Sequence, residues 1–283
     1  MKAAPLGLLL LFALVSTGAH SQWLNYPTPG IPRTRDGKPN LAAPAPRAAD
    51  GRPDLSGVWL HELTSVEEMK RLYGALVEEA IKVDVPGMQI GTQHKYAVNI
   101  LLDFKPEESP MRPEAAAILR RRATDADPAD VCVGAVGIPQ ADLLSEPIKI
   151  VQSPRMTVIL YEADNTHRQI YTDGRPLPVD PQPTWGGYSV GRWDGDTLIV
   201  DAAGFNEGTW LDSGGHPHSD ALRIQERFHR RDFGHMDLSV TVDDPKMYTK
   251  PFTIKVTELL LPDTDILESV CNENEKDRAH LDK

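Results

Sequence analysis

The chain has 283 residues, of which 40% are hydrophobic and 25% are charged, and its formal net charge at pH 7 is −11. Nucleic acids and anionic membranes attract basic surfaces, so this acidic balance argues against both as partners. The chain contains two cysteines, and neither lies in a zinc or redox motif.

The first residues have the three parts of a secretory signal sequence. Lys2 supplies the positive charge, residues 5–15 form an apolar run, and the small residues Ala19 and Ser21 precede a cleavage point before Gln22. The run is too short to cross a bilayer, and no later stretch is long enough. An uncleaved membrane anchor is the alternative. We therefore predict a signal peptide that ends at Ser21, and a secreted or periplasmic protein with no membrane span after processing.

Residues 22–54 are rich in proline, alanine, glycine and arginine. Proline removes backbone donors and fixes φ, which excludes a helix or a central strand. Two similar pieces, at residues 35–41 and 49–55, each contain an Asp-Gly turn followed by proline. We predict an extended arm that lies against a single domain over residues 55–283.

A first strand is predicted at residues 55–60, followed by a helical insert at residues 64–123. Ser65 and Glu68 form a capping box, and Pro113 is placed to begin a helix. Apolar residues recur at helical spacing between these two points. We expect two to four short helices, after Ser65 and over residues 76–83, 93–104 and 115–122.

From residue 147 onward the hydrophobic period changes to two, which is typical of strands. Short connections with Asp-Gly turns join these strands, without crossover helices. A long antiparallel meander usually closes into a barrel because closure removes its edges. We predict a mainly β fold, an antiparallel barrel, with strands at residues 148–152, 157–162, 167–172, 187–193, 197–202, 222–231, 236–242, 253–260 and 266–270.

The strand predicted at residues 222–231 contains one exception to its face pattern. Leu222, Ile224 and Phe228 share one face, and polar side chains share the other. Glu226 lies on the apolar face, where a carboxylate is costly unless it is paired or protonated. It forms an ion pair with an inward arginine, acts as a general acid or base in a cavity, or turns to solvent at a bulge.

An arginine partner is expected from the hairpin at residues 187–203. The predicted register pairs Arg192 with Thr197, and it places Tyr188, Arg192 and Asp201 on the same side. If that side faces the barrel interior, these residues help to bind a ligand. If it faces outward, they are ordinary surface residues. The apolar content of the two sides is compatible with both.

Residues 204–220 form a long loop, and long ordered loops are often functional. Its candidate residues are Asn206, Trp210, Asp212, His216 and His218. The histidines and Asp212 suit acid–base catalysis, and the other two suit ligand binding. The His-x-His spacing also permits a metal site with a neighbouring aspartate. A plain surface loop is the remaining alternative. We expect the other histidines without such spacing at the surface or at strand ends: His61, His94, His167 and His235.

Cys132 and Cys271 are expected to form a disulfide, because the predicted export leads to an oxidising compartment. The loop that it closes spans almost the whole predicted sheet. Two separate buried thiols are the alternative.

Two resemblances support this fold. Gly57-Val58-Trp59 resembles the G-x-W opening of a lipocalin first strand, in which the tryptophan plugs the closed end of the barrel. Most of the mature chain is similar to a large group of secreted bacterial proteins with no assigned biochemical role. The residues that carry this second resemblance are 54–59, 168–175, 187–193, 195–198, 244–245 and 268–273. It implies export and a shared lipocalin-like barrel, and it transfers no activity.

The expected function is the binding of a small, largely apolar molecule in the barrel cavity. Phe228 and Met236 would belong to the apolar wall, and Glu226, Arg192 and Tyr188 would provide polar specificity. One alternative is an enzyme of the isomerase, cyclase, hydratase or hydrolase type that uses Glu226 and loop histidines as acid and base. Another is a structural or interaction module with a packed barrel. The sequence does not identify a cofactor or an oligomeric state.

Overall fold

The computed structural model describes residues 27–74, 94–122 and 137–268. The predicted signal peptide at residues 1–21, the helix predicted at residues 76–83, and both Cys132 and Cys271 lie outside these ranges.

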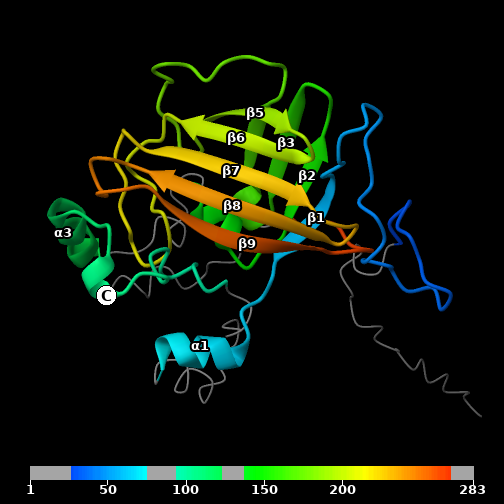
Figure 1. Cartoon of the computed structure of the whole chain (residues 1–283), viewed down its shortest axis with the longest axis horizontal. Helices are drawn as coiled ribbons and strands as arrows, with labels where there is room; N and C mark the ends of the chain where they lie inside the picture. Colours follow the sequence, from blue (N-terminus) through cyan, green and yellow to red (C-terminus); the bar gives the residue numbers. More distant parts are fainter. Residues whose placement is uncertain (1–26, 75–93, 123–136, 269–283) are drawn as a thin grey trace, which may run out of the picture.

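Nine strands of the described chain form a closed barrel in sequence order (Figure 1). Alternating hydrophobic residues drive this arrangement, because each strand buries one face. The predicted mainly β barrel is therefore confirmed, and each observed strand matches a predicted one to within two residues at either end. The strands are β1 Gly57–His61, β2 Ile148–Gln152, β3 Met156–Tyr161, β4 His167–Tyr171, β5 Tyr188–Asp194, β6 Thr197–Ala203, β7 Arg223–Arg230, β8 His235–Asp243 and β9 Phe252–Leu260.

The prediction of a purely antiparallel barrel is wrong at one place. β4 and β5 are parallel, with Ile170 opposite Ser189 and Tyr171 opposite Val190. Parallel neighbours need a crossover of a dozen or more residues. The proline-containing segment 172–187 supplies it here. The strand predicted at residues 266–270 is also wrong over the described residues 266–268, which have no regular structure.

The barrel interior is predominantly apolar. Phe228, Met236, Leu238 and Val240 on β7 and β8 are at most 2% exposed. The predicted inner faces of β7, β8 and β9 are confirmed, because their alternate residues are buried. This interior is the hydrophobic core of the molecule.

The arm has no helix or strand over residues 27–54, apart from isolated bridges. It contains two copies of one turn. Arg33 donates to the carbonyl of Gly37 at 3.0 Å, and Arg47 donates to the carbonyl of Gly51 at 2.9 Å. Each arginine also reaches an aspartate of the barrel domain: Arg33 pairs with Asp263 and Arg47 with Asp196. The two turns therefore attach the arm at two points, at one end of the barrel (blue in Figure 1).

The arm lies on the turn between β7 and β8. The amide of Gly234 donates to the carbonyl of Leu41 at 2.8 Å, and a Cβ at Gly234 would lie 2.4 Å from the side chain of Leu41. Glycine is required there because the two segments approach so closely. Beneath them, the Arg230 guanidinium lies 4.7 Å above the ring of fully buried Trp59. Arg230 therefore packs against the first strand of the barrel through Trp59.

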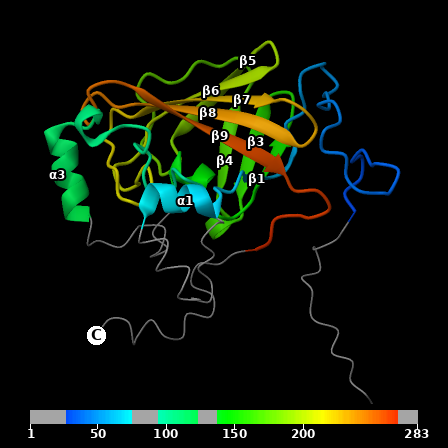
Figure 2. The same cartoon turned by 60° about the horizontal axis from the view of Figure 1, so that its bottom comes forward.

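The helical insert contains two described α-helices, α1 Val66–Tyr73 and α3 Pro113–Arg122, and the single 3₁₀ turn η1 Pro106–Glu108. One of the two hydrogen bonds of the capping box is confirmed, because Ser65 Oγ accepts from the Glu68 amide at 3.2 Å. α3 lies beyond the end of the barrel opposite the arm, and α1 lies outside the wall (Figure 2). No helix in the described ranges has the length and apolarity to span a membrane.

The helix predicted at residues 93–104 is wrong over the described residues 94–104, which form turns. Side chains bind the amides that a helix would use. Asp212 accepts from the Ile100 amide at 2.6 Å, and Asn99 accepts from the Leu101 amide at 3.0 Å. Such local bonds compete with helix formation. The segment is buried against the barrel end by Ile100 and Leu101.

Candidate binding site inside the barrel

Glu226, the predicted exception on β7, faces the interior and is fully buried. Its Oε1 accepts from Nη1 of Arg168 at 2.8 Å, and its Oε2 accepts from Nη2. Arg168 comes from β4, and its Nε donates to Ser189 Oγ on β5 at 3.0 Å. The ion pair with an inward arginine is thus the alternative that the structure bears out. Arg168 shares its strand face with buried Ile170. The alternation along this strand therefore indicates that Arg168 points inward.

The second polar group comes from η2, the 3₁₀ turn Gln140–Leu143, in which all four residues are buried. Asp142 Oδ1 accepts from the Tyr161 hydroxyl at 3.0 Å, and Oδ2 has no hydrogen-bond partner among the described residues. Burial, and secondly the charge of Glu226, raises the pKa of Asp142 to about 7. At pH 7 the Asp142 side chain is therefore protonated, and neutral, in a substantial fraction of the molecules.

The third polar group is Glu258, on the inner face of β9. It is 1% exposed, and its Oε1 lacks a hydrogen-bond partner within the described part of the chain. Burial, and secondly the charge of Asp142, raises the pKa of Glu258 well above its usual value. Its neighbours in register are Met236 on β8 and His61 on β1. We call Asp142 Oδ2 and Glu258 Oε1 the open acceptors.

Two histidines extend this polar cluster. His61 and His94 are 2% and 6% exposed, and their ring centroids lie 5.4 Å apart. The prediction of a surface or strand-end position is therefore wrong for His94. His61 is at a strand end, as the last residue of β1, but it is buried. His61 lies two residues after Trp59 on the inward face of β1, which the alternation of the strand indicates. Burial, and secondly the neighbouring His61, lowers the pKa of His94 to about 3, so its ring is neutral.

The open acceptors determine what the interior can do. A buried polar atom without a hydrogen bond costs about 1–3 kcal/mol. Such atoms in folded proteins usually have a water or ligand as partner. The interior therefore combines an apolar wall with carboxyl groups that can still accept hydrogen bonds.

The loop at residues 204–220 is largely buried, and its candidate acid–base residues contact partners within the loop. His216 Nδ1 lies 2.6 Å from Asp212 Oδ2, within ion-pair distance but without hydrogen-bond alignment. His218 Nε2 lies 2.6 Å from Thr209 Oγ1. No hydrogen bond or ion pair of the described residues joins this loop to Glu226.

The predicted ligand residues of the loop also have local partners. The Asn206 side chain accepts from the Gly208 amide at 3.0 Å, and the Arg122 guanidinium lies 5.2 Å from the Trp210 ring centroid. No group of three or more metal-binding side chains occurs in the described ranges. The two histidines therefore face separate partners there.

Tyr188 and Arg192 do not line the interior. The register pairs Arg192 with Ile199, two residues beyond the predicted Thr197, because the turn is Gly195-Asp196. Arg192 is 59% exposed at its side chain and pairs with Asp201 on the outer face. The Tyr188 ring stacks on Tyr171 at 5.3 Å. The inner face of this hairpin instead carries Ser189, Leu198 and Val200.

Comparison of the chain with family models, curated proteins and solved structures found no match.

Proposed function

We propose that the protein binds a small, largely apolar molecule inside the barrel, through a head group that donates hydrogen bonds to Asp142 and Glu258. The observation that carries this proposal is the pair of open acceptors in a predominantly apolar interior. A primary amino group on the ligand has enough N–H donors for both, whereas a single hydroxyl can donate to one of them. The predicted signal peptide implies that binding takes place in the periplasm or outside the cell.

The contacts of Glu226 favour binding over the acid–base alternative. Both of its carboxylate oxygens accept hydrogen bonds from Arg168. Removing Glu226 from this pair to transfer a proton would leave a buried charge without its partner, which is strongly unfavourable. We therefore propose that Glu226 and Arg168 hold the site in position, and that the open acceptors bind the ligand.

The test is a titration with three probes of equal chain length: 1-hexanol, hexylamine and hexanoate. The reporter is the ¹³C-methyl NMR signal of Met236, which is fully buried and opposite Glu258. We expect hexanol and hexylamine to shift this signal. Hexanoate carries a negative charge that is costly to bury in the apolar interior, so it should bind at least about tenfold more weakly.

The matched variants are Glu258→Met and Lys255→Met. Both lie on β9, the first on the inner face and the second exposed on the outer face. Glu258→Met should weaken hexanol binding about tenfold, because one hydrogen bond is lost, whereas Lys255→Met should leave it unchanged. An unshifted Met236 signal with every probe, or equal affinity in both variants, would refute the proposal.

A further inference from the structure

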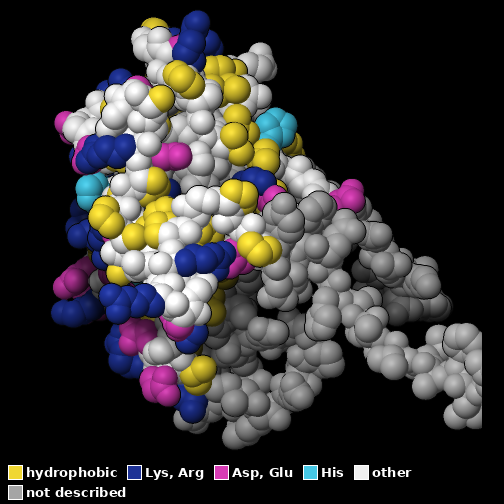
Figure 3. Space-filling view, turned by 90° about the vertical axis from the view of Figure 1, so that its right-hand side faces the viewer, with side chains coloured by type: hydrophobic (Ala, Val, Ile, Leu, Met, Phe, Trp, Pro, Cys, Tyr) yellow, Lys and Arg dark blue, Asp and Glu magenta, His cyan; other side chains and the backbone are white. Residues whose placement is uncertain are grey.

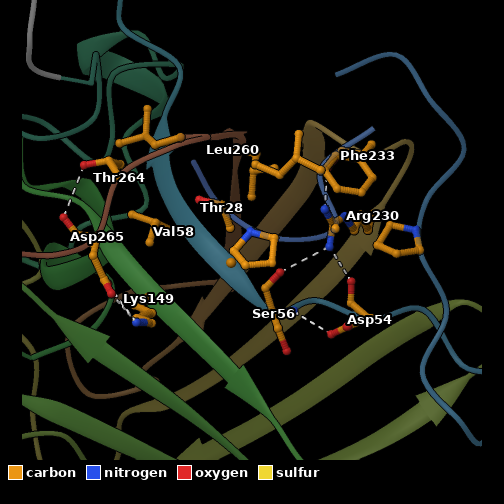
Figure 4. A pocket seen from close by; sticks show the side chains of 16 residues that line it. Thr28, Asp54, Ser56, Val58, Lys149, Arg230, Phe233, Leu260, Thr264 and Asp265 are labelled. Atoms are coloured by element: carbon orange, nitrogen blue, oxygen red, sulfur yellow. Dashed lines mark hydrogen bonds and ion pairs between the residues drawn. The ribbon is translucent and has the colours of Figure 1, made fainter. Parts of the chain in front are cut away.

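A groove outside the barrel lies at the arm end (Figure 4). It is formed by residues 28–31 of the arm, the start of β1, β2, the turn between β7 and β8, and the end of β9 with the residues after it. Its volume is about 460 Å³, within the range of small-molecule sites. Neither of the open acceptors belongs to its lining, so the groove is distinct from the interior site.

Every charged side chain of the groove lining already has a hydrogen-bond partner, and Lys149 and Asp265 form an ion pair. Lys149 Nζ lies 2.7 Å from both carboxylate oxygens of Asp265. Arg230 donates to the carbonyls of Asp54 and Ser56 at 2.5 and 3.3 Å, and also to that of Phe233. Asp54 Oδ1 accepts from the Ser56 amide at 2.9 Å. Figure 4 shows the lysine pair on one side and the arginine cluster on the other.

The surface between these pairs is largely apolar, with the lining side chains Pro29, Ile31, Pro46, Val58, Phe233, Leu260 and Leu261. Gly57 allows Leu260 to pack closely against the start of β1, because a Cβ at position 57 would lie 2.5 Å from Leu260 Cδ1. Figure 3 faces the arm side of the molecule and shows hydrophobic side chains in separate groups between basic and acidic ones. The groove is therefore a bounded apolar surface, not part of a continuous one.

The arm wall of the groove is fixed in position. Asp263 accepts from the Thr28 amide at 2.8 Å and from Arg33 at 2.5 Å, and its own amide donates to Thr28 Oγ1 at 3.1 Å. Asp263 also adopts a φ of +59°, a conformation that is uncommon for residues other than glycine. A wall that is already ordered costs a ligand little conformational entropy on binding.

We infer that this groove is a second binding site, for a small, neutral, apolar molecule. Its size admits one such ligand. The lining holds two basic and two acidic side chains: Lys149 pairs with Asp265, and Arg230 and Asp54 are hydrogen-bonded to backbone groups. An anion or cation would therefore have to break an existing interaction. The ligand is held by contact with the apolar floor.

The experiment compares two fluorescent probes of similar shape on the full chain. N-phenyl-1-naphthylamine is neutral, and 8-anilinonaphthalene-1-sulfonate carries a negative charge. We expect one molecule of the neutral probe to bind with enhanced fluorescence, and the anionic probe to bind at least tenfold more weakly. Equal binding of both, or no binding of the neutral probe, overturns the inference.

Two variants locate the bound probe. Thr264→Trp fills the groove from the β9 side and Ile31→Trp fills it from the arm, whereas Val151→Trp adds the same bulk at an exposed position on β2 outside the lining. The first two should reduce probe affinity at least tenfold, and Val151→Trp should not. Unchanged affinity in both filling variants overturns the inference.

Cross-controls separate this site from the interior one. Glu258→Met should leave the naphthylamine affinity unchanged, and Thr264→Trp should leave the Met236 response to hexanol unchanged. Loss of naphthylamine binding in Glu258→Met would place the probe inside the barrel and overturn the inference. If the protein is a dimer that dissociates in Thr264→Trp, the groove binds a second copy of the chain. This result would also overturn the inference.

Discussion

The carboxyl of Asp142 should make stability depend on pH. Its ordinary pKa of 3.8 rises to about 7 in the folded protein. The folded state therefore binds a proton more tightly than the unfolded chain does. This contribution to the free energy of unfolding is fully present below pH 4, and it falls as the pH rises toward 7, by up to about 1.4 kcal/mol per pH unit.

Urea unfolding between pH 4.5 and 8 tests this prediction. Asp142→Asn keeps the shape of the side chain and removes its titration, so the loss of stability with rising pH should be smaller in this variant. Ion-paired surface carboxylates titrate in both proteins and cancel in the comparison. Glu107→Gln, exposed in η1, is the control and should follow the unsubstituted protein. Parallel curves for Asp142→Asn and the unsubstituted protein would contradict the prediction.

The sequence indicates some of the site residues and not others. The burial of Glu226 follows from its place among Ile224 and Phe228 on one strand face. Its partner does not follow, because Arg168 is three strands away in the barrel and the parallel β4–β5 pair shifts the expected neighbours. Asp142 carries no periodic signal at all, since it lies in a 3₁₀ turn of four residues.

At the scale of elements, Arg230 joins the arm to the barrel through several hydrogen bonds from one buried side chain. Arg230 donates to carbonyls before β1 and in the β7–β8 turn, and it lies above Trp59. Lysine cannot reproduce this fork of donors. We expect Arg230→Lys to lower the free energy of unfolding by about 2–4 kcal/mol, because charged hydrogen bonds are lost in a partly buried site.

Arg47→Lys is the comparison for that experiment. Arg47 makes a two-pronged contact with Asp196 at 2.9 and 2.7 Å, but both side chains are about half exposed. Exposed ion pairs contribute little, so the urea midpoint should hardly change. A larger loss in Arg47→Lys than in Arg230→Lys would show that the surface contacts, not Arg230, hold the arm.

Local sequence signals predict a helix or strand well where the long-range contacts of the segment favour the same structure. The capping box at Ser65 and the proline at the start of α3 both mark real helices. The spacing of Tyr96, Ile100 and Phe104 is also helical, yet the segment forms turns, because the carboxylate of Asp212 binds a backbone amide there. That contact joins residues far apart in the chain, and periodicity cannot reveal it.

At the scale of the molecule, barrel closure is predictable because a long run of amphipathic strands leaves two exposed edges, and pairing the first strand with the last removes both. The direction of β5 is not predictable in the same way. Asp173-Gly174 has the composition of a hairpin turn, but the prolines that follow carry the chain along the outside of the barrel before β5 begins. The crossover then places Ser189, and not Tyr188 or Arg192, beside Arg168.

The predicted disulfide concerns the whole barrel, because every strand from β2 to β9 lies between Cys132 and Cys271 in the sequence. Closing so long a loop restricts the unfolded chain and, in the chain-entropy model, stabilises the folded one by roughly 4–5 kcal/mol. Peptide mapping of the protein without reductant should find the two cysteines linked. Reduction should then lower the melting temperature, and Cys132→Ser should melt at the temperature of the reduced protein. Alkylation of both thiols in the unreduced, unfolded protein would contradict the linkage.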